Sequence, residues 1–123
     1  MANPVVHFEI IGAEPEKIQS FYSRAFDWKI DTNNPMSYGM VSTQGDAGYG
    51  INGGIGAPVA PDYPGHLTFY VEVADVAAAL EKITELGGKT LMERTELPMV
   101  TVGMFTDPFG HVVGLVEPPR EAS

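Results

Sequence analysis

Three side chains are placed so that they could do acid–base or ligand chemistry: His7, Glu9 and His66. His7 and Glu9 stand two positions apart in the apolar segment 5–11, so on a β-strand they point to the same face. His66 opens a second apolar segment, 66–73. Glu9 could serve as a general base whose pKa is raised by burial, or lie as a solvated acid at a cavity mouth. The two histidines could contact a ligand, bind a metal, or be cavity-wall side chains satisfied by hydrogen bonds.

The elements that must position these side chains repeat along the chain. Segment 5–11 precedes a helix that starts near Pro15 and carries a predicted buried face of Ile18, Phe21, Tyr22, Ala25 and Phe26. Segment 66–73 leads through Asp75, a good N-cap, into a helix that Gly87 ends. Three short strands should follow each helix, at 28–31, 38–43 and 49–55 and then at 89–93, 100–106 and 112–117. The order predicts an α+β fold of two βαβββ modules with one helix each.

The domain boundaries follow from the proline and glycine content. Residues 56–65 are rich in both and form the expected linker between module one, about 5–55, and module two, about 66–118. Each module could cover only one face of its sheet, so we expect residues 1–123 to form a single domain.

Composition excludes several classes of protein. The formal net charge is −9 with scattered Lys and Arg, which disfavours nucleic acid and anionic membranes as partners. The absence of cysteine removes thiolate catalysis and thiolate metal sites and favours a cytoplasmic location. No signal peptide is recognisable at the start, and no apolar run is long enough to span a bilayer.

The double βαβββ order, a second module opening on Gly65-His66, and the ending Asp107-Pro108-Phe109-Gly110 before an apolar strand resemble the vicinal oxygen chelate superfamily. That superfamily includes glyoxalases, bleomycin-resistance proteins and extradiol dioxygenases. The resemblance covers nearly the whole chain and implies curled mixed sheets around a cavity. It also implies a homodimer and a divalent metal held by one ligand from each of four strands.

His7 and His66 fall at two of the implied ligand positions. The other two positions lack a carboxylate, because they fall at Gly114 and at Asn52 or Gly53. A divalent metal is therefore possible, but only two of its four ligand positions hold a suitable side chain, and two imidazoles alone hold such an ion weakly. The glycines at 48, 50, 53, 54 and 56 either mark bulges or let a ligand or a backbone approach.

Two functions follow from the resemblance and stay open. The first is a glyoxalase-like lyase or isomerase on a small oxygenated substrate, related to the dioxygenases, with Glu9 as the catalytic residue. The second is a non-catalytic, metal-free protein that binds a ligand or antibiotic. For either one we expect substrate contacts from His7, His66, Tyr70, Asn52 and Met104, of which Tyr70 and Met104 are candidates for an apolar lining.

Overall fold

The computed structural model describes residues 2–119 and confirms the predicted α+β fold. Within these residues the order strand, helix and three strands occurs twice, with one α-helix in each copy. The chain forms two compact units, one of residues 7–68 and one of residues 2–6 with 69–119. We call them the amino-terminal and the carboxy-terminal unit. Residues 1 and 120–123 of the predicted domain lie outside the described part.

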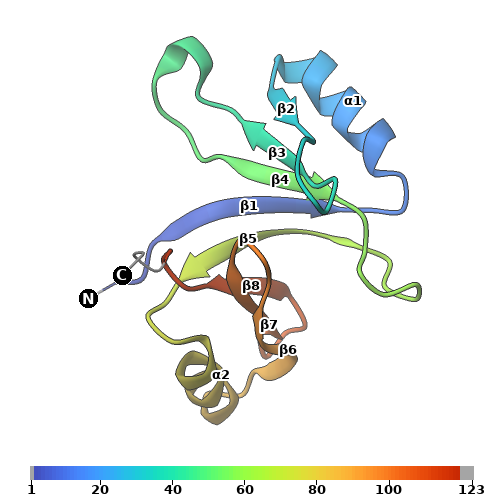
Figure 1. Cartoon of the computed structure of the whole chain (residues 1–123). Coiled ribbons are helices and arrows are strands. Elements are labelled where there is room, and N and C mark those ends of the chain that lie inside the picture. The colour runs from blue at the N-terminus through green and yellow to red at the C-terminus, as the bar shows by residue number, and fades with distance from the viewer. Residues whose placement is uncertain (1, 120–123) are drawn as a thin grey trace. The chain divides into compact units, whose positions relative to one another are not determined.

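The amino-terminal unit builds a small mixed sheet with one helix (Figure 1). Its strands lie in the order β2-β3-β4-β1, where β1 is parallel to β4 and the other neighbours are antiparallel. Register pairs Phe8 with Gly53 and Glu9 with Gly54, so Glu9 and Phe8 point to opposite faces. Phe8 packs against Trp28, at 5.4 Å between ring centroids, as the predicted alternation requires. The elements are β1 (Val5–Ile11), α1 (Pro15–Phe26), β2 (Lys29–Asp31), β3 (Gly39–Ser42), a 3₁₀ turn (Gly45–Ala47) and β4 (Gly53–Gly56).

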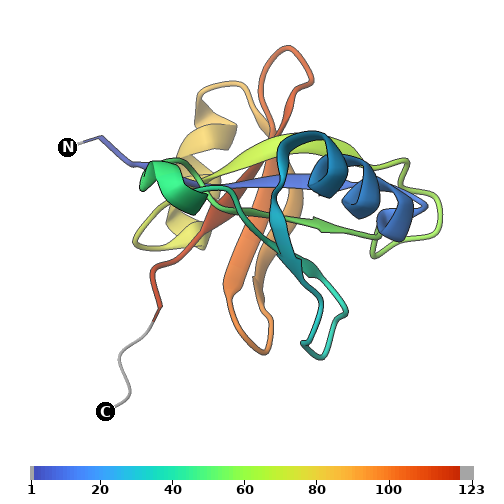
Figure 2. The ribbon, with the colours of Figure 1, turned by 90° about the horizontal axis from the view of Figure 1, so that it is seen from above.

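Helix α1 runs along the strands of its own unit (Figure 2) but buries less than its sequence pattern predicts. It runs from Pro15 to Phe26 and is followed by its C-cap Asp27, whose φ of 59° is left-handed. The Gln19 side chain donates to the carbonyl of Ile55 (2.8 Å) and ties the helix to β4. The prediction that Phe21 and Phe26 are buried is wrong, since they are 63% and 61% exposed. Their rings instead join an aromatic cluster on the helix surface with Tyr22 and Trp28.

The carboxy-terminal unit repeats the arrangement with strand order β5-β8-β7-β6 and β5 parallel to β8. Asp75 caps α2 as predicted, because its carboxylate accepts the N–H groups of Ala77 and Ala78. The core of the unit contains Val76, Leu80 and Leu115. Its elements are β5 (His66–Glu72, of which Phe69 onward belongs to this unit), α2 (Val76–Glu85), β6 (Lys89–Glu96), β7 (Thr101–Thr106) and β8 (Val112–Val116).

Two strands differ from their predicted positions: β6 extends to Glu96 rather than to residue 93, and β4 is shorter than predicted. The segment 49–55 is predicted to be extended throughout, whereas β4 covers only Gly53–Gly56. Gly48 and Gly50 have φ values of 76° and 127°, which are turn conformations that glycine adopts at little cost. Gly48 and Gly50 therefore belong to the chain reversal before the strand, whereas Gly53, Gly54 and Gly56 lie in the strand.

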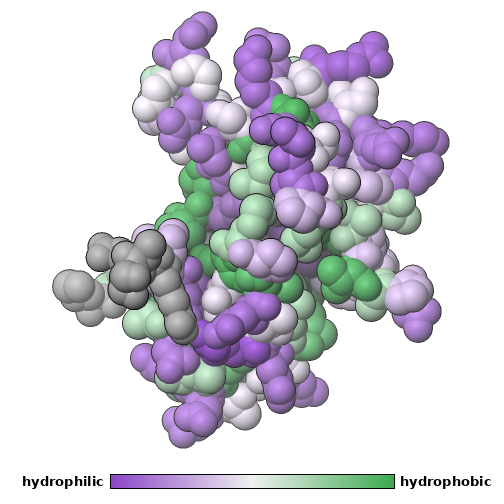
Figure 3. Space-filling model, in the orientation of Figure 1, coloured by the Kyte–Doolittle hydropathy of each residue, from purple (hydrophilic) through white to green (hydrophobic). Residues whose placement is uncertain are grey.

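Hydrophilic side chains are prominent on the visible face of the molecule (Figure 3). On the face shown in Figure 3, hydrophilic side chains spread over the outer loops and helices. Among residues 2–119 there is no helix long and apolar enough to cross a membrane.

Candidate functional site

A buried carboxylate lies at the centre of the candidate site. Glu9 is 8% exposed and is the buried charged residue of the described chain. It stands on β1, on the face of the amino-terminal sheet that points away from Trp28. The interpretation of Glu9 as a solvated acid is therefore wrong. A buried carboxylate needs hydrogen-bond donors, and the unit supplies them.

Glu9 belongs to a continuous chain of five hydrogen-bonded side chains, which we call the Glu9 relay. His66 Nε2 lies 2.7 Å from Glu9 Oε1, and Tyr38 Oη donates to Glu9 Oε2 at 2.8 Å. Beyond these, Tyr63 Oη lies 2.5 Å from His66 Nδ1, and His7 Nε2 lies 3.1 Å from Tyr38 Oη. All five residues belong to the amino-terminal unit.

With Glu9 ionised, the donor and the acceptor of each hydrogen bond in the relay can be assigned. The Tyr38 hydroxyl donates a hydrogen bond to Glu9, so its oxygen accepts a hydrogen bond from the Nε2–H of His7. His66 donates Nε2–H to Glu9, and its Nδ1 then accepts from the hydroxyl of Tyr63. In this arrangement each of the four contacts has one donor and one acceptor.

Tyr38 reaches Glu9 because two glycines leave room for its ring. A Cβ placed on Gly54 would overlap ring atoms of Tyr38, and one on Gly56 would lie 2.8 Å from that ring. The ring therefore lies directly over the β4 backbone. Gly54 and Gly56 do allow a close approach, but the group that approaches is a side chain of the same unit and not the ligand or backbone that was expected.

The loop before β3 fixes Tyr38 from the other side. The Asn34 amide donates to the carbonyl of Tyr38 (2.6 Å), and its oxygen accepts the N–H groups of Met36 (3.1 Å) and Tyr38 (3.0 Å). Ser37, just before Tyr38, has a left-handed φ of 51°. A non-glycine residue holds this conformation only where its surroundings impose it.

Burial and the charge of Glu9 shift the pKa values of two members of the relay, His7 and Tyr63. Burial lowers the pKa of His7 below its ordinary value, while the nearby Glu9 acts in the opposite direction. Burial, followed by the charge of Glu9, raises the pKa of the Tyr63 phenol. At neutral pH His7 is therefore a neutral imidazole able to accept a proton, and Tyr63 stays a hydrogen-bond donor.

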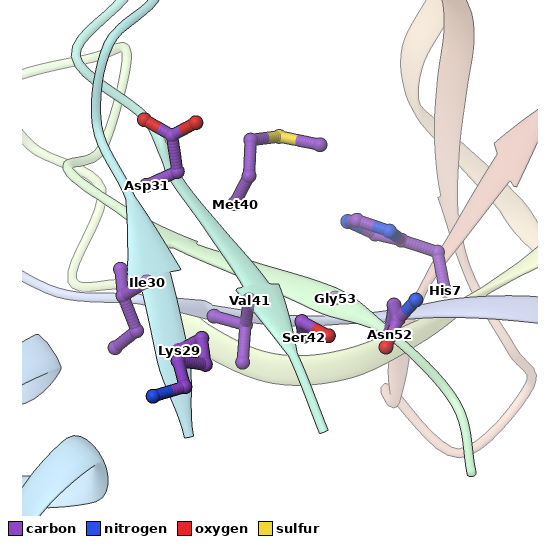
Figure 4. A pocket seen from close by; sticks show the side chains of 9 residues that line it. All are labelled: His7, Lys29, Ile30, Asp31, Met40, Val41, Ser42, Asn52 and Gly53. Atoms are coloured by element: carbon purple, nitrogen blue, oxygen red, sulfur yellow. The ribbon is translucent and has the colours of Figure 1, made fainter. Parts of the chain in front are cut away.

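His7 connects the relay to a groove of about 450 Å³. The groove lies on the same unit and is also lined by Lys29, Asp31, Met40, Ser42 and Asn52. Figure 4 shows His7 and Met40 reaching toward each other from β1 and β3, with Asn52 beside His7. The volume falls within the range of about 300–1,000 Å³ that is usual for small-molecule sites.

Four of the predicted site residues come together and two do not join them. His7, Glu9, His66 and Asn52 all belong to the amino-terminal unit, whereas Tyr70 and Met104 belong to the other. These two are each 7% exposed and flank Gly114 in the register of their own sheet. The site residues predicted from sequence therefore come from two units.

The residues present do not fit the metal that the resemblance implies. Across residues 2–119, no three His, Asp or Glu side chains are placed so that they could hold an ion together. A Cβ on Gly114 would lie 2.5 Å from the ring of Tyr70, so that ring fills the space where a longer side chain would stand. A Cβ on Gly53, the other implied position without a carboxylate, would overlap Phe8. We derive no step through a metal.

Sequence reasoning missed two members of the relay, Tyr38 and Tyr63. Tyr38 opens the predicted strand 38–43, where the strand pattern gives no hydrogen-bond partner, and Tyr63 lies in the segment interpreted as a linker. The signal for Tyr38 was present in the glycines of β4, since adjacent glycines on a sheet leave space that an aromatic ring can fill. Tyr63 had no comparable signal.

The family comparison agrees with this fold. The model of the family described as "Glyoxalase/Bleomycin resistance protein/Dioxygenase superfamily" matches residues 5–115. Among curated proteins, "Putative glyoxylase CFP32" of Mycobacterium tuberculosis (strain CDC 1551 / Oshkosh) is 30% identical over 112 residues. That match covers 83% of this chain and 41% of the relative, so the chain spans less than half the length of the relative.

Solved structures with low sequence identity share the fold. A hypothetical protein, BH1468 from Bacillus halodurans C-125, superposes with a TM-score of 0.68 at 12% identity, covering 100% of this chain and 99% of the other. Methylmalonyl-CoA epimerase from Mycobacterium tuberculosis gives a TM-score of 0.60 at 15% identity. There the match covers 94% of this chain and 88% of the other.

Proposed function

The chain belongs to the glyoxalase/bleomycin resistance protein/dioxygenase superfamily, and from that premise we propose that it binds a small oxygenated molecule in the His7 groove and moves a proton on it. The reaction class is that of an isomerase or lyase acting next to a carbonyl group. The observation that carries the proposal is the buried carboxylate of Glu9, joined through Tyr38 to a neutral imidazole at the groove.

Each relay member has a role in such a transfer. His7 accepts a proton from the carbon next to the substrate carbonyl, and the electron pair of that C–H bond stays on the substrate as an enolate. The imidazolium that forms is stabilised by the negative charge of Glu9, which Tyr38 connects to His7. His7 then returns the proton to the same or a neighbouring carbon. His66 donates a hydrogen bond that holds Glu9 in place and stabilises its negative charge, and Tyr63 orients His66.

A structural neighbour supports this class of chemistry without defining the substrate. The neighbour from Mycobacterium tuberculosis is a methylmalonyl-CoA epimerase, and epimerisation inverts one carbon centre. The curated relatives are named as a glyoxylase. For this chain we infer only that the substrate carries a carbonyl next to an acidic C–H bond.

Hydrogen exchange tests the proposal directly. The protein is incubated in D₂O with pyruvate, methylglyoxal and methylmalonyl-CoA, and deuterium entry at the carbon beside the carbonyl is followed by NMR. At least one compound should exchange faster than in buffer, and Glu9→Gln and His7→Gln should each lower that rate by about 10²-fold or more. Glu16→Gln, at an exposed position on α1, is the matched control and should keep the wild-type rate.

Two results would overturn the proposal. One is exchange no faster than in buffer for all three compounds, and the other is an unchanged rate in Glu9→Gln. One equivalent of zinc, nickel or iron, lost together with activity in both His7→Ala and His66→Ala, would replace it with a metal-dependent mechanism.

The second candidate is a binding protein without turnover, as in the antibiotic-binding branch of the superfamily. It is favoured by one observation: both oxygens of Glu9 are already hydrogen-bonded, as in a network that only shapes a cavity wall. Ligand binding that persists in Glu9→Gln, with no exchange in the wild type, would support this function.

A further inference from the structure

We propose that the groove selects a small monoanionic carboxylate, whose carboxylate group is held by the donors of Ser42 and Asn52 with Lys29 beside them, and whose carbon with the acidic C–H bond lies at His7. The ligand class follows from the groove itself. Only the removal of a proton from the ligand's C–H bond depends on the proposed function.

The register of three strand pairs puts these donors in one row. Lys29 pairs with Ser42 across β2 and β3. Val41 pairs with Gly53 across β3 and β4, so one position further along Ser42 lies beside Asn52. Phe8 pairs with Gly53 across β4 and β1, which sets Asn52 beside His7. Lys29, Ser42, Asn52 and His7 therefore stand in one row across the sheet, and Figure 4 shows the ammonium group of Lys29 turned away from Ser42, at the outer end of the row.

The amide of Asn52 is held with its donor side toward His7. Its Oδ1 accepts the N–H of Thr43 (3.0 Å), which assigns the other terminal atom as the NH₂ group. The hydroxyl of Thr43 also donates to the carbonyl of Ile51 (2.7 Å) and fixes the segment that carries Asn52. Figure 4 shows the amide nitrogen on the side of His7 and the oxygen turned away. The groove thus meets a fixed N–H donor, the group that a carboxylate or a developing enolate oxygen requires.

The charges around the groove restrict the ligand further. Among the described residues that line it, Lys29 is the one with a permanent positive charge. Asp31 lines the same groove, and its Oδ1 accepts the N–H of Asn33 (2.8 Å), so a carboxylate is held at the far edge. A second anionic group on the ligand would meet that carboxylate and the overall charge of −9. A ligand with one carboxylate group is therefore favoured over a ligand with two. Met40 supplies an apolar contact for the uncharged part.

The test compares a carboxylate with its neutral ester. Pyruvate and methyl pyruvate are titrated into the full chain, and dissociation constants are read from ¹H–¹⁵N NMR shifts. Pyruvate should bind about tenfold more tightly, because hydrogen bonds to a charged group are the stronger ones. Its shifts should include the side-chain NH₂ of Asn52.

Two variants remove parts of the row. Asn52→Asp keeps an oxygen for Thr43 N–H but replaces the donor by a charge of the wrong sign, and Lys29→Met removes the ammonium group. Each should weaken pyruvate about tenfold or more and leave methyl pyruvate within about twofold. Lys17→Met, at an exposed site on α1, is the matched control and should change neither constant. Ser42→Ala tests the middle of the row and should weaken pyruvate alone.

Equal affinity for acid and ester would overturn the inference, as would unchanged pyruvate binding in both Asn52→Asp and Lys29→Met. The titration needs no turnover, so the two proposals fail separately. Selective pyruvate binding without hydrogen exchange removes the proposed reaction and keeps the ligand class. Exchange that is unaffected by the two row variants keeps the relay and removes the ligand class.

Discussion

At the scale of single residues, the protonation of His7 decides whether the site has a base. The imidazole lies between the groove and Tyr38, and its burial lowers its pKa. A histidine with an ordinary pKa near 6.5 would be partly charged in mildly acid solution. The arrangement keeps His7 neutral to lower pH and therefore extends the range in which it can accept a proton.

This pKa has a consequence for stability that follows from proton linkage. The folded pKa of His7 lies below the unfolded value of about 6.5, so between the two values the unfolded chain binds more protons than the folded chain. The free energy of unfolding should consequently fall as pH decreases through that window. NMR titration should place the pKa of His7 below 6.5, and urea unfolding of His7→Gln should lack this part of the pH slope. A pKa at or above 6.5 would contradict the assignment.

The site residues that the sequence could predict are those on strands. Alternation along a strand was enough to predict that His7 and Glu9 share a face, and the repeat indicated His66 as their counterpart. The roles of Tyr38 and Tyr63 were not predicted. Tyr38 was expected to open the strand 38–43 but stands just before β3, and Tyr63 lies in the linker, where no periodicity fixes the direction of a side chain. Their contacts to Glu9 and His66 depend on loop conformation.

At the scale of elements, the loop between β2 and β3 works as a support for the relay. Asn34 makes three hydrogen bonds to the backbone of this loop, and two of them are to Tyr38 itself. The left-handed Ser37 turns the chain so that the ring of Tyr38 lies over Gly54 and Gly56. Asn34 touches neither the groove nor Glu9 in the interactions described, so it is a positioning residue.

Removing this support should affect the site more than the fold. Asn34→Ala deletes the three hydrogen bonds and should cost about 1–3 kcal/mol in urea unfolding. With Tyr38 no longer fixed, water should reach His7 and raise its pKa toward 6.5, while hydrogen exchange slows. Asn33→Ala, the neighbouring position, is the control. A loss of stability with an unchanged pKa of His7 would show that Asn34 supports only the loop.

The sequence predicted elements well where one signal dominated. Asp75 and Gly87 bounded the second helix because a carboxylate cap and a glycine stop act locally. The strand expected at 49–55 was wrong in its first half because Gly48 and Gly50 adopt positive φ values before the strand, and sequence alone does not separate these glycines from those in the strand. The buried face of α1 was wrong because helical spacing predicts an apolar stripe but not what covers it.

At the scale of the whole molecule, that uncovered stripe is the feature that remains to be explained. Phe21 and Phe26 are more than half exposed and lie in an aromatic cluster with Tyr22 and Trp28. Exposed aromatic groups of this size on a protein surface usually mark an interaction site. A second copy of the chain is the partner we expect. The strong negative net charge disfavours anionic partners, and in a two-fold symmetric dimer the apolar face of one copy packs against the same face of the other.

A dimer formed through α1 makes a direct prediction about mass. Light scattering at micromolar concentration should give about twice 13.2 kDa for the wild type, and Phe21→Ser with Phe26→Ser should return the mass to about 13.2 kDa. Tyr49→Ser is the matched control, since Tyr49 is 77% exposed in a loop of the same unit and its loss should leave the dimer intact. Urea unfolding should show that the double variant is folded. A wild-type mass of 13.2 kDa would exclude the dimer, and a dimer that survives the double variant would place its interface away from α1.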